Sequence, residues 1–152
     1  MTIKLGINGF GRIGRMIFRT ALNNPEIEVT AINDLTDTKT TAHLLEYDSV
    51  HGLLNRSVTA EKDCLNIDGK TIKNFSYKDP GQIPWKNANV DIVCECTGLF
   101  RDHESASKHF EGGARKMELS FRNFGIKYDK LLERRDRFSL FKSITRIDLD
   151  KE

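Results

Sequence analysis

The sequence lacks any apolar run that approaches the roughly 18 residues of a membrane-spanning helix, so it excludes a helical membrane protein. Its first residues, Met1-Thr2-Ile3-Lys4-Leu5-Gly6, turn polar and glycine-rich too early for a secretory signal. We therefore expect a cytoplasmic chain with no membrane partner.

Cysteine is scarce and its spacing does not suit metal or disulfide chemistry. Cys64, Cys94 and Cys96 are odd in number and form no C-x-x-C pair. They indicate neither a disulfide framework nor a zinc site, and free thiols fit a reducing compartment. We predict no metal site.

An excess of charge of one sign is also missing. The chain has 24 Lys and Arg against 22 Asp and Glu, for a net charge of +2. Acidic and basic residues balance over residues 1–116, so the excess lies in residues 117–152. This distribution excludes the basic stripe typical of a nucleic-acid-binding surface. A chain of 152 residues can build one substantial core.

The chain begins with an alternation of strands and helices. An apolar run predicts a strand over residues 3–8. Apolar residues at helical spacing then predict a helix that ends before Pro25, namely Ile13, Met16, Ile17 and Ala21. A second strand follows over residues 27–33, and Asp37 can cap a further short helix.

The middle of the chain changes period. Residues 56–77 alternate with period two around Asp68-Gly69, which predicts an antiparallel hairpin. Residues 90–96 form a nearly continuous apolar run, typical of a parallel strand buried on both faces. Asp102 can cap a helix over residues 103–110. The fold class is therefore α/β, with helices on both faces of a parallel sheet and an inserted antiparallel region.

Residues 117–152 have a different character, and we assign them to a divergent charged tail. Five apolar residues follow helical spacing, interrupted by Gly125 and Arg135: Phe124, Tyr128, Leu131, Leu132 and Phe138. A partly helical tail and a solvated one both fit this pattern. The predicted organisation is thus one domain over residues 1–116, followed by the tail.

One segment carries clear chemical content. Gly9-Phe10-Gly11-Arg12-Ile13-Gly14 is a G-x-G-x-x-G motif between a predicted strand and a predicted helix. In a dinucleotide site the first glycine allows the tight turn, the second lets the pyrophosphate approach, and the third allows close packing of helix and strand. The helix N-terminus then offers N–H groups to the phosphates.

Glycines also fill turns for steric reasons alone, so the motif needs support from its context. Asp34 ends the second predicted strand, 20 residues after Gly14, close to the spacing of an acid that binds the adenosine ribose. Its carboxylate would repel a 2′-phosphate, which favours NAD over NADP.

Four segments resemble consecutive landmarks of phosphorylating glyceraldehyde-3-phosphate dehydrogenases: Asn8-Gly9-Phe10-Gly11-Arg12-Ile13-Gly14-Arg15, Ala31-Ile32-Asn33-Asp34, Glu46-Tyr47-Asp48-Ser49-Val50-His51-Gly52 and Glu95-Cys96-Thr97-Gly98-Leu99-Phe100. The resemblance runs from Met1 to about Lys116. It implies a Rossmann-like domain that binds NAD.

The resemblance also implies a set of cofactor contacts. Arg12 and Ile13 would lie at the pyrophosphate, Lys78 beside the adenine, and Thr97 and Gly98 on the nicotinamide side. The full set of expected contacts is Asn8, Gly9, Phe10, Gly11, Arg12, Ile13, Gly14, Asn33, Asp34, Lys78, Thr97, Gly98 and Ser120.

The family's catalytic residues have no counterpart in these 152 residues. In that family a cysteine within Ser-Cys-Thr-Thr-Asn attacks the aldehyde, a histidine acts as base, hydride passes to NAD and phosphate resolves the thioester. That segment does not occur here. Cys94 and Cys96 should face one side of a buried strand, and Asp63 should raise the pKa of Cys64. We interpret His103 and His109 as parts of a solvated helix.

Three functions remain open. The chain is an NAD-binding fragment of such a dehydrogenase, inactive alone and truncated or frame-shifted near Met117. Alternatively, it is one piece of a split or erythrose-4-phosphate-type dehydrogenase that a partner chain completes. The third possibility is a non-functional product whose exposed apolar surface drives self-association. Besides NAD, the expected partners are therefore other copies of this chain or full-length dehydrogenase subunits.

Overall fold

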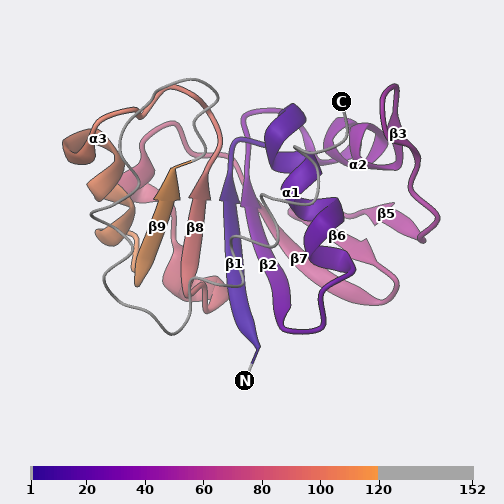
Figure 1. Cartoon of the computed structure of the whole chain (residues 1–152), viewed down its shortest axis with the longest axis horizontal. Helices are drawn as coiled ribbons and strands as arrows, with labels where there is room; N and C mark the ends of the chain where they lie inside the picture. The colour runs from indigo at the N-terminus through magenta and orange to yellow at the C-terminus, as the bar shows by residue number, and fades with distance from the viewer. Residues whose placement is uncertain (1, 120–152) are drawn as a thin grey trace. The chain divides into compact units, whose positions relative to one another are not determined.

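The computed structural model describes residues 2–119, which contain a seven-stranded sheet in the order β5-β6-β7-β2-β1-β8-β9 (Figure 1). Its strands are β1 (Ile3–Asn8), β2 (Ile27–Asn33), β5 (Val58–Ala60), β6 (Cys64–Ile67), β7 (Lys70–Phe75), β8 (Ile92–Glu95) and β9 (Lys116–Leu119). The helices are α1 (Arg12–Leu22), α2 (Thr38–Glu46) and α3 (His103–Ser107), with short 3-10 turns η1 (Pro80–Gln82), η2 (Trp85–Ala88) and η3 (Lys108–Phe110).

The centre of the sheet is parallel. β1 pairs with β2 on one side and with β8 on the other, β2 pairs with β7, and β8 pairs with β9. Helices or 3-10 turns lie in the connections between these parallel strands, as in a Rossmann-like α/β fold, and the connection from β2 to β7 also contains antiparallel strands. The predicted fold class is therefore confirmed.

The predicted hairpin is present, and it extends the same sheet. β6 and β7 pair antiparallel around Asp68 and Gly69, whose φ angles of 50° and 84° are those of a two-residue hairpin turn. β7 also pairs parallel with β2, so the antiparallel strands widen the sheet at one edge. A small separate sheet, β3 (Tyr47–Asp48) with β4 (Gly52–Leu53), was not predicted.

The two faces of β1 carry different elements, because successive strand residues point to opposite sides. A Cβ on Gly14 of α1 would lie 3.1 Å from Ile7 Cγ2, so α1 covers the Ile7 face (Figure 1). A Cβ on Gly6 would lie 2.8 Å from Trp85 Cζ3, so η2 covers the opposite face. Trp85 belongs there to a buried cluster with Ala31, Ile83, Ala88, Val90, Val93 and Ala114.

β9 carries the sheet three residues past Lys116, through Leu119. Residues 120–152, which make up the rest of the predicted tail, lie outside the described residues. The division of the chain at residue 117 therefore stays a prediction. Among the helices of residues 2–119, none is long and apolar enough to cross a bilayer.

Candidate functional site

The carboxyl ends of β2, β1 and β8 lie side by side, and this edge is where the order of the chain reverses. From β1 the chain goes to β2 on one side and returns later to β8 on the other. In open α/β sheets, ligands bind outside the strand ends at such a switch point. The predicted glycine motif begins at this edge, directly after β1.

The three glycines of the motif have three different surroundings. Gly9 has a φ of 88°, and a Cβ there would lie 2.7 Å from the backbone nitrogen of Thr97. A Cβ on Gly14 would overlap the Gly9 carbonyl oxygen. A Cβ on Gly11 would meet nothing within 4 Å. The first glycine therefore serves the turn, the third serves helix packing, and the second faces open space where a ligand can approach.

Helix α1 begins at this open space without a side-chain cap. Its N-cap residue is Gly11, and its first turn contains no acidic residue. Arg12 is exposed, and Ile13 is partly buried. The first N–H groups of a helix need acceptors from outside it and carry a partial positive charge. This helix start is therefore suited to an anion such as a pyrophosphate.

Asp34 lies between β2 and the glycine loop. One carboxylate oxygen accepts the backbone N–H of Phe10 at 2.6 Å, and the other accepts that of Thr36 at 2.9 Å. A carboxylate has about four acceptor positions, so these two bonds use about half of them. Asp34 therefore holds the loop in place and keeps acceptor capacity for hydroxyl groups.

Two buried asparagines connect the strand ends. Asn33 Nδ2 donates to Asn8 Oδ1 at 2.8 Å and to the Tyr77 carbonyl at 2.9 Å. Asn33 Oδ1 accepts the Tyr77 N–H at 2.9 Å. These bonds fix the segment after β7, where Lys78 is exposed beside Tyr77.

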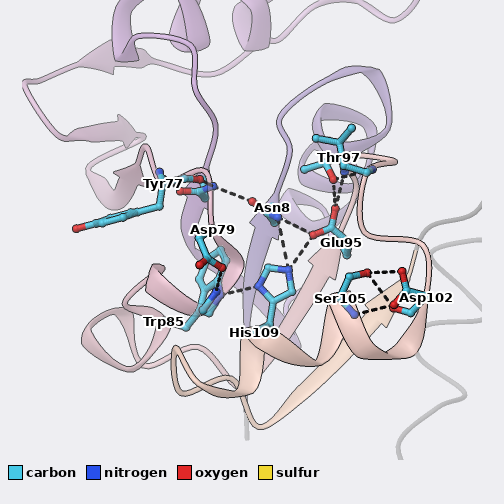
Figure 2. Close-up of polar contacts among 12 residues, drawn as sticks. Asn8, Tyr77, Asp79, Trp85, Glu95, Thr97, Asp102, Ser105 and His109 are labelled. Atoms are coloured by element: carbon cyan, nitrogen blue, oxygen red, sulfur yellow. Dashed lines mark hydrogen bonds and ion pairs between the residues drawn. The ribbon is translucent and has the colours of Figure 1, made fainter.

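On the β8 side, the buried carboxylate of Glu95 collects several donors (Figure 2). Asn8 Nδ2 lies 2.6 Å from Glu95 Oε2, and His109 Nε2 lies 2.8 Å from the same oxygen. The backbone N–H of Thr97 donates to Glu95 Oε1 at 2.8 Å, and the Thr97 hydroxyl donates to it as well. The start of the loop after β8 is thus bound to the last residue of its own strand.

The structure brings most of the predicted contacts to one edge of the sheet. These are Asn8, the motif from Gly9 to Gly14, Asn33, Asp34, Thr97 and Gly98, with Lys78 on the neighbouring loop. Ser120 lies outside the described residues. Which of these residues touch a cofactor stays a prediction.

The interpretation of His109 as a solvated residue is wrong. Its side chain is fully buried. Trp85 Nε1 donates to His109 Nδ1 at 3.0 Å, and His109 Nε2 faces Glu95. Glu95 and Trp85 were not predicted from the sequence as part of this site. An acid within the apolar run of residues 90–96 was a usable signal, since a buried charge requires partners.

The described cysteines are poorly placed to act as nucleophiles. The Glu61 carboxylate, which accepts the Cys64 thiol, raises the pKa of that thiol above its ordinary value. Cys94 is buried within β8, and Cys96 is partly buried. Within residues 2–119, no group of three or more His, Cys, Asp or Glu side chains is arranged to hold a metal ion.

Comparison with known proteins agrees with this geometry. Residues 3–103 match the family model described as glyceraldehyde 3-phosphate dehydrogenase, NAD binding domain. The chain is 54% identical over 117 residues to glyceraldehyde-3-phosphate dehydrogenase 1 of Bacillus cereus, which covers 77% of this chain and 35% of that protein. It is 53% identical over 120 residues to the Geobacillus stearothermophilus enzyme, covering 79% and 36%. The chain thus spans about a third of the length of these relatives.

Proposed function

This chain belongs to the glyceraldehyde-3-phosphate dehydrogenase family and carries its NAD-binding domain, and on that premise we propose how it holds the cofactor. In the proposal, NAD lies across the carboxyl ends of β2, β1 and β8. Its pyrophosphate sits at the start of α1, with the adenosine half over β2 and the nicotinamide half over β8.

The surroundings of Gly11 carry the proposal. It is the one glycine of the motif at which a Cβ would meet nothing within 4 Å, and it stands at the start of a helix that no side chain caps. A pyrophosphate there would supply the acceptors and the negative charge that the helix start lacks. Glycine leaves room for the close approach of phosphate oxygens.

The adenosine half fits the position of Asp34. A ribose with both hydroxyls free can donate to the carboxylate, which is already oriented by Phe10 and Thr36. A 2′-phosphate would bring negative charge against it, so the site prefers NAD to NADP. Lys78 is exposed on the loop after β7, and in the proposal it lies beside the adenine.

When bound, NAD supplies a hydride acceptor. We propose that the described residues bind and orient it but do not themselves oxidise an aldehyde. The thiol of Cys64 has a raised pKa and Cys94 is buried, and neither state favours a reactive thiolate. Dehydrogenation would require a nucleophile from outside residues 2–119.

Isothermal titration of the purified chain with NAD, ADP and NADP tests the proposal. We expect Asp34→Ala to weaken NAD binding by about 1.5–3 kcal/mol, the range for hydrogen bonds to a charged group. It should also narrow the difference between NAD and NADP. Asp63→Ala, at an exposed acid of the hairpin region, is the matched control and should leave both affinities unchanged. Equal NAD affinities for the wild-type chain and Asp34→Ala would refute this placement of the ribose.

A further inference from the structure

A chain of hydrogen bonds links the strand ends. Its first side chain is Asn33, and the orientation of the Asn33 amide is fixed by its partners. The backbone N–H of Tyr77 donates to Asn33 Oδ1, and Asn33 Nδ2 donates to the Tyr77 carbonyl, both at 2.9 Å. Since backbone groups cannot exchange roles, they determine which end of the Asn33 amide is oxygen and which is nitrogen.

The orientation of the Asn33 amide in turn fixes the orientation of the Asn8 amide. Asn33 Nδ2 donates to Asn8 Oδ1 at 2.8 Å, so the nitrogen of the Asn8 amide must face the other way. It does, because Asn8 Nδ2 lies 2.6 Å from Glu95 Oε2. This branch therefore delivers a proton donor to the Glu95 carboxylate.

A second branch reaches the same Glu95 oxygen through His109, beside Asn8 (Figure 2). An indole N–H can only donate, so Trp85 Nε1 makes Nδ1 of His109 an acceptor at 3.0 Å. The ring proton of His109 must then be on Nε2, which lies 2.8 Å from Glu95 Oε2. Trp85 thus selects the tautomer that donates to the carboxylate.

A third branch comes from the loop after β8. The backbone N–H of Leu99 donates to Thr97 Oγ1 at 3.1 Å, which leaves the Thr97 hydroxyl proton for Glu95 Oε1. The Thr97 backbone N–H donates to the same oxygen at 2.8 Å. All three branches therefore end on the carboxylate of Glu95, a residue that is 3% exposed.

An ionised carboxylate can accept every one of these bonds, and an amide cannot. In a glutamine, one of the two terminal groups would be a donor and would face either Asn8 and His109 or the Thr97 N–H. Every one of those neighbours is itself fixed as a donor. Two accepting oxygens at Glu95 are thus required to satisfy all of these donors at once.

We propose that Glu95 is a positioning residue for the nicotinamide half of the cofactor, acting through Thr97. The inference rests on the proposed function, in which the adenosine half lies over β2 and the pyrophosphate at α1. The remaining half must then extend over β8, where Glu95 is the last strand residue. Gly98, with a φ of 71° and open space at its Cβ position, borders that half beside the anchored Thr97.

The test compares two probes, NAD and ADP, by titration of the full chain. ADP contains the adenosine and the pyrophosphate but lacks the nicotinamide nucleoside. We expect Glu95→Gln to weaken NAD by about tenfold, as for the loss of a hydrogen bond to a charged group, and to change ADP affinity by less than about twofold. Asp34→Ala should weaken both probes alike.

A merely structural role for Glu95 would lower both affinities together, so an unchanged ratio of the two dissociation constants overturns the proposal. If Glu95→Gln does not fold, Thr97→Val decides, because it removes only the hydroxyl branch. In Thr97→Val the dissociation constant for NAD should rise relative to that for ADP. Thr97→Ser should reverse most of this change. Equal ratios in Val and Ser variants overturn the proposal. If the wild-type chain binds neither probe, the proposed function fails, and this inference fails with it.

Discussion

The start of α1 and the starts of α2 and α3 solve the same problem in different ways. Asp37 caps α2 by accepting the Thr40 N–H at 3.0 Å, and Asp102 caps α3 by accepting the Ser105 N–H at 2.7 Å. The Thr40 hydroxyl and N–H lower the pKa of Asp37, and the Ser105 N–H and hydroxyl lower the pKa of Asp102. Helix α1 begins instead with Gly11 and no side-chain cap.

The difference shows where the chain gives up local stability. A capping side chain in place of glycine typically stabilises a helix start by roughly a few tenths of a kcal/mol, so its omission from the longest described helix has a small cost. The omission coincides with the open space at Gly11 and with the switch point of the sheet. Local rules are commonly broken where a ligand completes the structure.

The largest expected effect comes from giving α1 the cap that the other helices have. We expect Gly11→Asp to raise the melting temperature of the free chain, since the carboxylate can accept the first helical N–H groups. The same charge would repel a pyrophosphate and should weaken NAD by about 100-fold or more. Calorimetry and titration with NAD measure the two effects.

A neutral cap separates the effect of the negative charge on NAD affinity from the effect of side-chain size. Gly11→Asn offers the same acceptor without the negative charge, so its loss of NAD affinity should be clearly smaller. If Gly11→Asp bound NAD as well as the wild-type chain, the contrast between the helix starts would have no connection with the cofactor.

The second effect concerns stability at the other end of the motif. We expect Gly14→Ala to destabilise the domain by about 1–3 kcal/mol, because the added methyl would overlap the Gly9 carbonyl and push α1 away from β1. Urea unfolding of Gly14→Ala beside Gly11→Ala measures this difference. A Gly14→Ala variant as stable as Gly11→Ala would contradict the assigned roles of the two glycines.

The third effect is the loss of the existing caps. Asp37→Ala and Asp102→Ala should each lower the melting temperature by a few degrees, because each leaves a helix start without its acceptor. NAD affinity should not change, since the side chains of Asp37 and Asp102 bond to residues of their own helix starts. A change in NAD affinity comparable with that of Asp34→Ala would show that the caps and the cofactor site are not independent.

The smallest effect depends on pH. The cap aspartates have a folded pKa below the ordinary value of 3.8, so the unfolded chain binds more protons in that range. Their contribution is complete above the unfolded value and is lost as the pH falls through the folded pKa. Urea midpoints between about pH 5 and pH 3 should therefore fall less in an Asp37→Ala, Asp102→Ala double variant than in the wild-type chain.

Periodicity and turn chemistry were sufficient to predict most elements of this fold, but not the β3–β4 sheet or β9. The strand over residues 3–8, the Asp68-Gly69 hairpin and the caps at Asp37 and Asp102 were all predicted from local patterns and are present. The pairing of β7 with β2 was not predicted, because it depends on contacts between distant segments.

The buried polar groups around Glu95 were harder to predict. His109 lies in a polar segment, and only its packing against Trp85 reveals that it is buried. Glu95 and Asn8 are separated by 87 residues and meet because β1 and β8 are neighbours. Local sequence patterns cannot specify such contacts until the strand order is known.

The position of Trp85 also has an optical consequence. It is the chain's single tryptophan, so the tryptophan emission comes from one indole, fully buried and hydrogen-bonded to an imidazole. Unfolding would expose that indole to water and shift its emission to longer wavelength. One intrinsic fluorophore therefore reports the integrity of the face of the sheet opposite α1, without any added label.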